Sequence, residues 1–174
     1  MAKKHFSEEV EQEMTLFQIR KADANDGSAI LNCLAAAFER YRNQYTAGAF
    51  ADTVLDSQTV QYRLREMCVF VAVSEDKIVG TIGCSMHKTE GDGSQGHLRG
   101  MAVLPEWQGT EVASALLQAA EAELMKDGCT CVTLDTTEPL TRAIRFYERH
   151  GFSASGRGSD FFGMRLYEYS KALP

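Results

Sequence analysis

The order in which strand and helix patterns follow one another constrains the fold of this chain most. Apolar residues that alternate with polar ones predict strands, and apolar residues three or four positions apart predict helices. The predicted elements are, in chain order, a strand at 16–22, a helix after the capping residues 24–26, a helix over about 51–66, strands at 68–74, 77–87 and 96–104, a helix that ends at Gly128, a strand at 131–136, a helix within 139–151 and two final strands. The order β-α-α-β-β-β-α-β-α-β-β indicates an α/β protein without internal repeats or linkers.

The length of 174 residues fits one domain with a single hydrophobic core. We expect this domain to span residues 16–174, because residues 1–15 are charged, carry no complete apolar stripe and are typical of an N-terminal extension. Hydrophobic residues make up 44% of the chain, which excludes a wholly disordered protein. No apolar run reaches the roughly 20 residues that a bilayer requires, and the first residues lack a signal peptide. The sequence therefore predicts a cytoplasmic protein without a membrane partner.

Charge and cysteine content argue against two classes of function. With 18 Lys and Arg against 24 Asp and Glu, the formal net charge is -6, which repels nucleic acids and tolerates a cationic amine better. The five cysteines are odd in number and lack the paired CxxC spacing of a zinc site. We therefore expect reduced thiols, no metal and no nucleic-acid partner.

The most informative stretch is the junction 103–117, which reads VLPEWQGTEVASALL. It places a short turn and a helix N-terminus directly after a strand, where unpaired backbone N–H groups can bind phosphate. The stretch resembles the pyrophosphate loop of the GNAT superfamily of acyl-CoA-dependent N-acyltransferases, which reads Q/R-x-x-G-x-G/A before a Leu-rich helix. The matching positions are Gln108, Gly109, Thr110, Glu111, Val112 and Ala113, with Glu111 where the family usually has Gly. An ordinary strand-to-helix turn is the alternative interpretation.

A second match lies downstream, where AIRFYERHGF at 143–152 is similar to the family's A-I-x-F-Y-E-K-x-G-F segment. Leu140 stands where the family has an Asn that contacts the cofactor. The resemblance implies a mixed, mostly antiparallel central sheet with a splayed strand pair that admits pantetheine, flanked by about four helices. The predicted order of elements agrees with that fold.

The resemblance also implies two catalytic residues. Tyr147 matches the tyrosine that commonly protonates the departing CoA thiolate, and packing in the core is the alternative role for it. His97 lies on the strand before the loop, where members of the family often carry a Glu or His base. A base is needed because an aliphatic amine is mostly protonated at neutral pH. The alternative for His97 is a strand histidine satisfied by hydrogen bonds.

Further site residues are implied by the same resemblance. The cofactor-binding residues would be Met101, Ala102, Val103, Gln108, Gly109, Thr110, Glu111, Val112, Ala113, Ser114 and Tyr147. The acceptor would be bound by the first two helices, their connection and the last hairpin, with Phe38, Tyr41 and Tyr45 as candidate contacts.

The sequence thus predicts an N-acetyltransferase that transfers an acetyl group from acetyl-CoA directly to an amine in a ternary complex. The amine is left open among a small amine, an amino acid, an aminoglycoside, and a protein lysine or N-terminus. A non-catalytic acyl-CoA-binding or regulatory module of the same fold is the alternative, because Glu111 and Leu140 depart from the family at cofactor contacts. A homodimer is compatible with the sequence.

Overall fold

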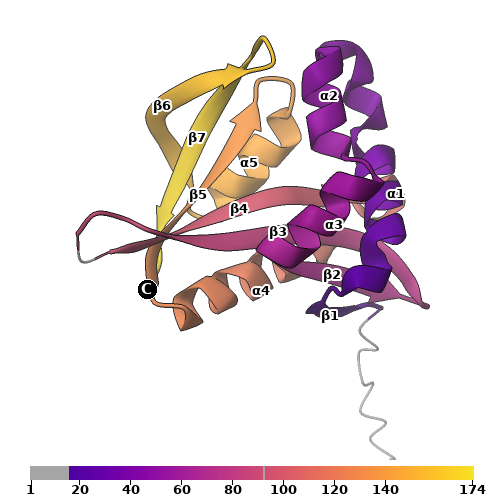
Figure 1. Ribbon diagram of the computed structural model, residues 1–174, viewed down its shortest axis with the longest axis horizontal. Coiled ribbons are helices and arrows are strands. Elements are labelled where there is room, and N and C mark those ends of the chain that lie inside the picture. Colours follow the sequence, from indigo (N-terminus) through magenta and orange to yellow (C-terminus); the bar gives the residue numbers. More distant parts are fainter. Residues whose placement is uncertain (1–15, 92) are drawn as a thin grey trace, which may run out of the picture.

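The computed structural model describes residues 16–91 and 93–174, which form one seven-stranded sheet (Figure 1). The strand order is β1-β2-β3-β4-β5-β7-β6, and all neighbours are antiparallel except the parallel pair β4 and β5. The strands are β1 (Gln18–Lys21), β2 (Cys68–Ser74), β3 (Lys77–Lys88), β4 (Ser94–Val103), β5 (Cys129–Thr137), β6 (Ser153–Phe161) and β7 (Met164–Ala172). The predicted mixed, mostly antiparallel sheet is confirmed. The predicted extension at 1–15 lies outside the described residues.

Helices cover both faces of the sheet. The helices are α1 (Gly27–Phe38), α2 (Ala47–Val54), α3 (Ser57–Glu66), α4 (Val112–Lys126) and α5 (Thr141–Arg149). On one face α1 packs on β3 and β4, and α2 and α3 pack on α1. On the other face α4 approaches closely, because a Cβ atom at Gly96 would lie only 2.6 Å from Leu124 of that helix. A hydrogen bond of 3.1 Å between Ser114 and His150 joins the end of α5 to α4.

The single helix predicted over 51–66 is two helices in the structure. α2 ends before Leu55, whose φ of 63° lies in the left-handed region. Asp56 then caps α3 by accepting hydrogen bonds from the backbone N–H groups of Gln58 and Thr59, at 3.0 and 2.8 Å. The hydroxyl of Thr59 accepts in turn from the N–H of Asp56, which completes a capping box. This local start signal interrupts the apolar stripe and brings the number of described α-helices to five.

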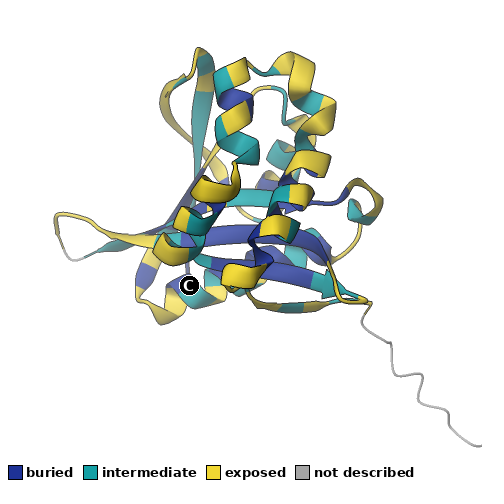
Figure 2. Cartoon of the chain, turned by 45° about the vertical axis from the view of Figure 1, so that its right-hand side comes forward, coloured by how far each residue is buried: buried dark blue, intermediate teal, exposed yellow. Residues whose placement is uncertain are grey.

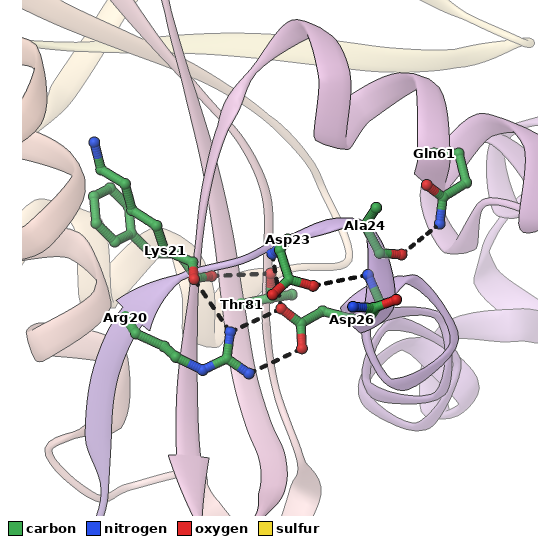
Figure 3. A network of polar contacts seen from close by, with 9 residues as sticks. Arg20, Lys21, Asp23, Ala24, Asp26, Gln61 and Thr81 are labelled. Carbon is green, nitrogen blue, oxygen red and sulfur yellow. Dashed lines mark hydrogen bonds and ion pairs between the residues drawn. The ribbon is translucent and has the colours of Figure 1, made fainter.

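A polar network fixes the start of α1 against β1 (Figure 3). Arg20 donates to both carboxylate oxygens of Asp26, at 2.8 and 2.9 Å. Asp26 also accepts from the N–H of Asp23, and the pKa of its carboxyl is lowered, mainly by Arg20. Gln61 of α3 donates to the carbonyl of Ala24 at 3.0 Å. The network therefore ties α1 and α3 to the same edge of the sheet.

The core lies between the central strands and the helices. Figure 2 shows the central strands largely buried and the outer surfaces of the helices exposed. All five cysteines are free, and Cys33, Cys84 and Cys129 are buried, as expected for reduced thiols. None of the helices within the described residues is long and apolar enough to span a membrane.

Candidate active site

The two parallel strands at the centre of the sheet separate toward one end. β4 and β5 are paired from Ser94 and Cys129 as far as Leu98 and Leu134, and residues 99–103 of β4 are not paired with β5. A cavity of about 510 Å³ opens at this split, with walls formed by both strands and by helices from both faces. Strand edges that separate in this way leave backbone N–H and C=O groups free to bind a ligand.

A β-bulge lies where β4 leaves β5. Thr81 of β3 pairs with Ala102, whereas Gly83 pairs with Arg99, so β4 carries an extra residue between these pairs. Gly100 occupies the bulge with a φ of 65°, a conformation that favours glycine. Because a bulge bends its strand and increases the local twist, it accounts for the separation of β4 from β5 at this point.

The two faces of the split carry different groups, and we call them the α1–α3 side and the α4–α5 side. Side chains alternate between the faces of a strand. Gly96 faces α4, so His97 and Arg99 point to the α1–α3 side. The parallel register pairs His97 with Thr133, which places Thr133 and Asp135 on that same side.

Most of the residues predicted to bind the cofactor line the cavity. Those that line the cavity are Met101, Ala102, Val103, Gln108, Gly109, Thr110, Ala113, Ser114 and Tyr147. The amide of Gln108 donates to the carbonyl of Val103 at 3.0 Å, which fixes the turn between β4 and α4. Gly109 has a φ of 78° and no atom within 4 Å of where a Cβ would lie, so the backbone of the turn is accessible.

Two residues predicted to bind the cofactor do not line the cavity. The side chain of Val112 is fully buried against β3, where a Cβ atom at Gly80 would lie 2.9 Å from it. Glu111 is exposed, immediately precedes α4, and makes no capping hydrogen bond to the helix. Neither residue is therefore part of the cavity wall.

Tyr147 enters the cavity from α5. Its residue is 7% exposed, and its ring packs edge-on against Phe146 and Phe152, with centroids at 5.4 and 5.7 Å. Its hydroxyl makes no hydrogen bond to any of the described residues. Burial raises the pKa of Tyr147 well above its usual value, so the phenol is protonated and can act as a proton donor. Packing and a site role are therefore both compatible with its position.

His97 is held by two groups of β5. Nδ1 lies 2.8 Å from the hydroxyl of Thr133, and Nε2 lies 3.6 Å from a carboxylate oxygen of Asp135. Because Thr133 donates to the carbonyl of Gly96, we assign the proton of the neutral ring to Nδ1, which leaves Nε2 as an acceptor. Burial lowers the pKa of His97, and the charge of Asp135 opposes this shift. The ring is thus neutral at neutral pH and able to accept a proton.

The aromatic residues predicted to contact the acceptor line the α1–α3 side. Phe38 lies between Tyr41 and Tyr45, with ring centroids at 6.1 and 6.3 Å. The hydroxyl of Tyr45 is hydrogen-bonded to Thr137 of β5 at 2.5 Å, which closes this wall against the sheet. The tip of the β6–β7 hairpin also reaches this wall, since Thr46 donates to the carbonyl of Phe162 at 2.8 Å.

Sequence reasoning missed several residues of the cavity wall. On β5 these are Asp135, Thr136 and Thr137, and the alternation of polar with apolar residues along 131–136 was the signal that could have found Asp135. Elsewhere they include Asp52, Arg63, Arg99, Arg142 and Arg149. No short motif marks these charged residues, because distant segments bring them together.

The cavity fits an extended ligand with a phosphate group. The hydroxyl of Thr136 is buried in the wall and has no hydrogen-bond partner among the described residues. The turn before α4 offers an accessible backbone at a helix N-terminus, and Arg142 and Arg149 line the cavity on the same side.

Within 16–91 and 93–174, no three His, Cys, Asp or Glu residues come together in a group able to hold a metal ion.

Known proteins with similar sequences are acetyltransferases. The chain is 30% identical over 105 residues to N-alpha-acetyltransferase 30 of Schizosaccharomyces pombe, a match that covers 56% of this chain and 70% of the relative. It is 32% identical over 115 residues to N-alpha-acetyltransferase MAK3 of Arabidopsis thaliana, covering 60% of this chain and 58% of that protein.

Solved structures share the fold. A crystal structure of the NatC complex bound to Gag peptide and CoA contains a chain that superposes with a TM-score of 0.71 at 15% identity, over 91% of this chain and 99% of that one. The model of the acetyltransferase (GNAT) family matches residues 30–152. Because that match covers well over half of the sequence, the chain belongs to the GNAT family of acetyltransferases.

Proposed function

We propose that this acetyltransferase moves the acetyl group of acetyl-CoA directly to the α-amino group of a peptide in a ternary complex. The main support is the split between β4 and β5, which opens one cavity to both faces of the sheet. A neutral histidine lines it from the α1–α3 side and a protonated tyrosine lines it from α5. The names of the two curated relatives favour a peptide α-amino group among the possible acceptors.

The α4–α5 side would hold acetyl-CoA. The backbone of 108–110 and the start of α4 suit the pyrophosphate, Arg142 and Arg149 suit phosphate charge, and the unpaired edge of β4 at 99–103 suits the amide groups of pantetheine. When bound, acetyl-CoA supplies the acetyl group as a thioester, whose C–S bond breaks as the amine nitrogen bonds to the carbonyl carbon.

His97 would remove the proton from the acceptor amine. An α-amino group has a pKa near 7.7 to 8.0, so a large part of it is protonated at neutral pH and cannot attack a thioester. Nε2 of His97 is the free acceptor, and the carboxylate of Asp135, at 3.6 Å, stabilises the imidazolium that results. Asp135 thus acts as a positioning and charge-balancing residue.

Tyr147 would protonate the departing thiolate. Its hydroxyl is unpartnered among the described residues and keeps its proton at neutral pH. A thiol with a pKa near 8.5 is a fair leaving group, and a phenol beside the sulfur completes the reaction by donating a proton. Two protons leave the nitrogen: the first passes to His97 before attack, and the second is released to solvent as the amide forms. The phenolic proton of Tyr147 ends on sulfur, and exchange with solvent then restores both side chains.

The test is release of free thiol from acetyl-CoA in the presence of a panel of peptides, free amino acids and amines. Acetylated peptide should accumulate in equal amount with the thiol. The alternative of a non-catalytic module predicts that acetyl-CoA binds, in calorimetry, while no member of the panel releases thiol. A cytoplasmic location and a homodimer stay predictions.

A further inference from the structure

Arg63 of α3 lies over the bulge of β4 at the cavity wall. A Cβ atom at Gly100 would collide with Nη1 of Arg63, so the guanidinium rests directly on the bare backbone of the glycine. Arg63 lines the cavity beside Gly100 and Arg99. The bulge that opens the split therefore also makes room for a cationic group on its α1–α3 side.

The guanidinium of Arg63 has no partner among the described residues. It makes no hydrogen bond to them and lies within 4 Å of none of their carboxylates, unlike the guanidinium of Arg20, which is paired with both oxygens of Asp26. Burial, supported by the nearby charge of Arg99, lowers the pKa of Arg63 to about 10, and Asp52 opposes this shift. The side chain is half-buried, and its unpaired donors face the cavity.

Arg99 and Asp52 complete the cluster. Arg99 lies 3.8 Å from Asp52, which is too long for a hydrogen bond, and both residues line the cavity. The three side chains Arg63, Arg99 and Asp52 carry one net positive charge inside a chain whose formal net charge is -6. We call this group the arginine cluster.

We propose that the arginine cluster binds a carboxylate on the acceptor, so that the preferred acceptor is an amine that also carries a carboxylate. Two guanidinium forks match a planar carboxylate, and one net positive charge balances one negative charge. A doubly charged phosphate would be only half neutralised by the one net positive charge. This inference rests on the proposed acyl transfer, because it assigns the substrate class of the same cavity.

The spacing along β4 sets where the carboxylate lies. Arg99 follows His97 by two residues on the same face, which separates their Cα atoms by roughly 6.6 Å. An acceptor whose amine lies at His97 and whose carboxylate lies at Arg99 must carry these two groups several bonds apart. A peptide with an acidic residue in its first two positions and a free acidic amino acid both meet this requirement.

The experiment compares matched acceptors in the thiol-release assay with wild-type protein. The peptide pair is Ala-Glu-Ala-Ala amide against Ala-Gln-Ala-Ala amide, and the amino-acid pair is glutamate against glutamine. We expect kcat/KM to be about tenfold or more higher for the carboxylate member of one pair, and the pair that shows it identifies the source. Turnover without a preference in either pair would overturn the proposal.

Three variants test whether the preference depends on Arg63. Arg63→Met should reduce the preference, measured as the ratio of kcat/KM between the two members of the pair, to below about threefold, because only the carboxylate member loses a partner. Arg65→Met is the matched control, since it removes an exposed arginine of the same helix, and should keep the full preference. Arg63→Lys keeps the charge without the fork and should give an intermediate preference. A preference that survives Arg63→Met counts against the cluster.

Direct binding separates this inference from the proposed function. If no acceptor releases thiol, the proposed transfer fails, and calorimetry with glutaramate, which carries one carboxylate, and the neutral glutaramide in the presence of CoA then tests the cluster by itself. Binding of glutaramate by wild-type protein that is lost in Arg63→Met supports the carboxylate site. Equal binding of both compounds, or of neither, overturns it.

Discussion

The α4–α5 side and the α1–α3 side of the cavity are built in different ways. On the α4–α5 side most of the wall comes from one stretch of the chain, 101–114, whose turn at Gly109 has an accessible backbone, joined by side chains of α5. On the α1–α3 side the wall includes aromatic and charged side chains from α1, α2, α3, the α1–α2 connection and two strands. A ligand common to a whole family can be held by backbone groups, whereas the choice of acceptor depends on side chains.

The electrostatics of the two sides differ as well. Tyr147, near α4, is surrounded by aromatic rings and keeps its proton, because burial alone shifts its pKa. His97, on the opposite side, lies among charged groups, and burial, Asp135 and Arg99 all act on its pKa. The comparison thus predicts a fixed proton donor on one side and a tunable proton acceptor on the other.

The largest expected effect comes from Tyr147→Phe. Loss of the proton donor should lower kcat by about 10²- to 10⁴-fold. The affinity for acetyl-CoA and the acceptor KM should change little, because the hydroxyl makes no hydrogen bond to the described residues. Steady-state kinetics and calorimetry with acetyl-CoA measure these quantities. Unaltered kcat would assign Tyr147 to packing alone and remove the proposed donor from the α4–α5 side.

Substitutions of His97 and Asp135 test the proton acceptor on the α1–α3 side. His97→Ala should lower kcat/KM by about 10²-fold at pH 7, the low end for a general base, since an α-amino group is already partly deprotonated there. In wild-type protein kcat/KM should rise with pH through a pKa below 6.5, because burial disfavours the imidazolium. Asp135→Asn should move this rise of kcat/KM to lower pH, since the carboxylate raises the pKa of His97.

Stability should follow the same titration. Folding lowers the pKa of His97 below its unfolded value near 6.5. The free energy of unfolding of the protein therefore does not depend on this residue's titration above pH 6.5, and it decreases as the pH falls from there toward the folded pKa. His97→Gln should therefore reduce the loss of melting temperature between pH 7 and pH 5. If kcat/KM of Asp135→Asn keeps the pH dependence of the wild-type protein, the carboxylate of Asp135 does not act on His97.

Tyr45→Phe probes the α1–α3 wall without touching the charged groups. The change leaves the buried hydroxyl of Thr137 without its partner and should lower the free energy of unfolding by about 1 kcal/mol. The acceptor KM should rise, whereas acetyl-CoA affinity should not change. Tyr41→Phe is the control, because Tyr41 makes no hydrogen bond to the described residues. Thermal unfolding and acceptor titrations would distinguish the two variants.

The smallest expected effect is that of Glu111→Gly. Removing a carboxylate at the start of α4 should tighten acetyl-CoA binding by no more than about fivefold, since repulsion at 4 Å in water is worth about 1 kcal/mol. The free protein should become slightly less stable, because an acidic residue favours a helix N-terminus. The gain in affinity should disappear at high salt. Weaker binding by the variant at low salt would show that Glu111 helps to hold the cofactor.

Local sequence signals predicted most of the elements. The hairpin at 68–87, the strand before Pro105 and the helix with Gly128 after its end all lie where periodicity and turn residues placed them. The error at 51–66 has a local cause: Leu55 adopts a left-handed conformation and Asp56 starts a new helix, while the apolar stripe continues across the break. Capping by Asp56 and Thr59 was readable in the sequence, whereas the conformation of Leu55 was not.

The sequence by itself determined the order of elements, the turn at 108–110 and the family, because each depends on residues that are close together in the chain. Only the tertiary structure decided that β4 leaves β5 after Leu98, that Asp135 faces His97, and that Arg63 rests on Gly100. These contacts join segments separated by more than thirty residues, and their energies depend on burial and on neighbouring charges. Hydrophobic periodicity records which face of an element is buried, but it does not record which charged side chains meet across a cavity.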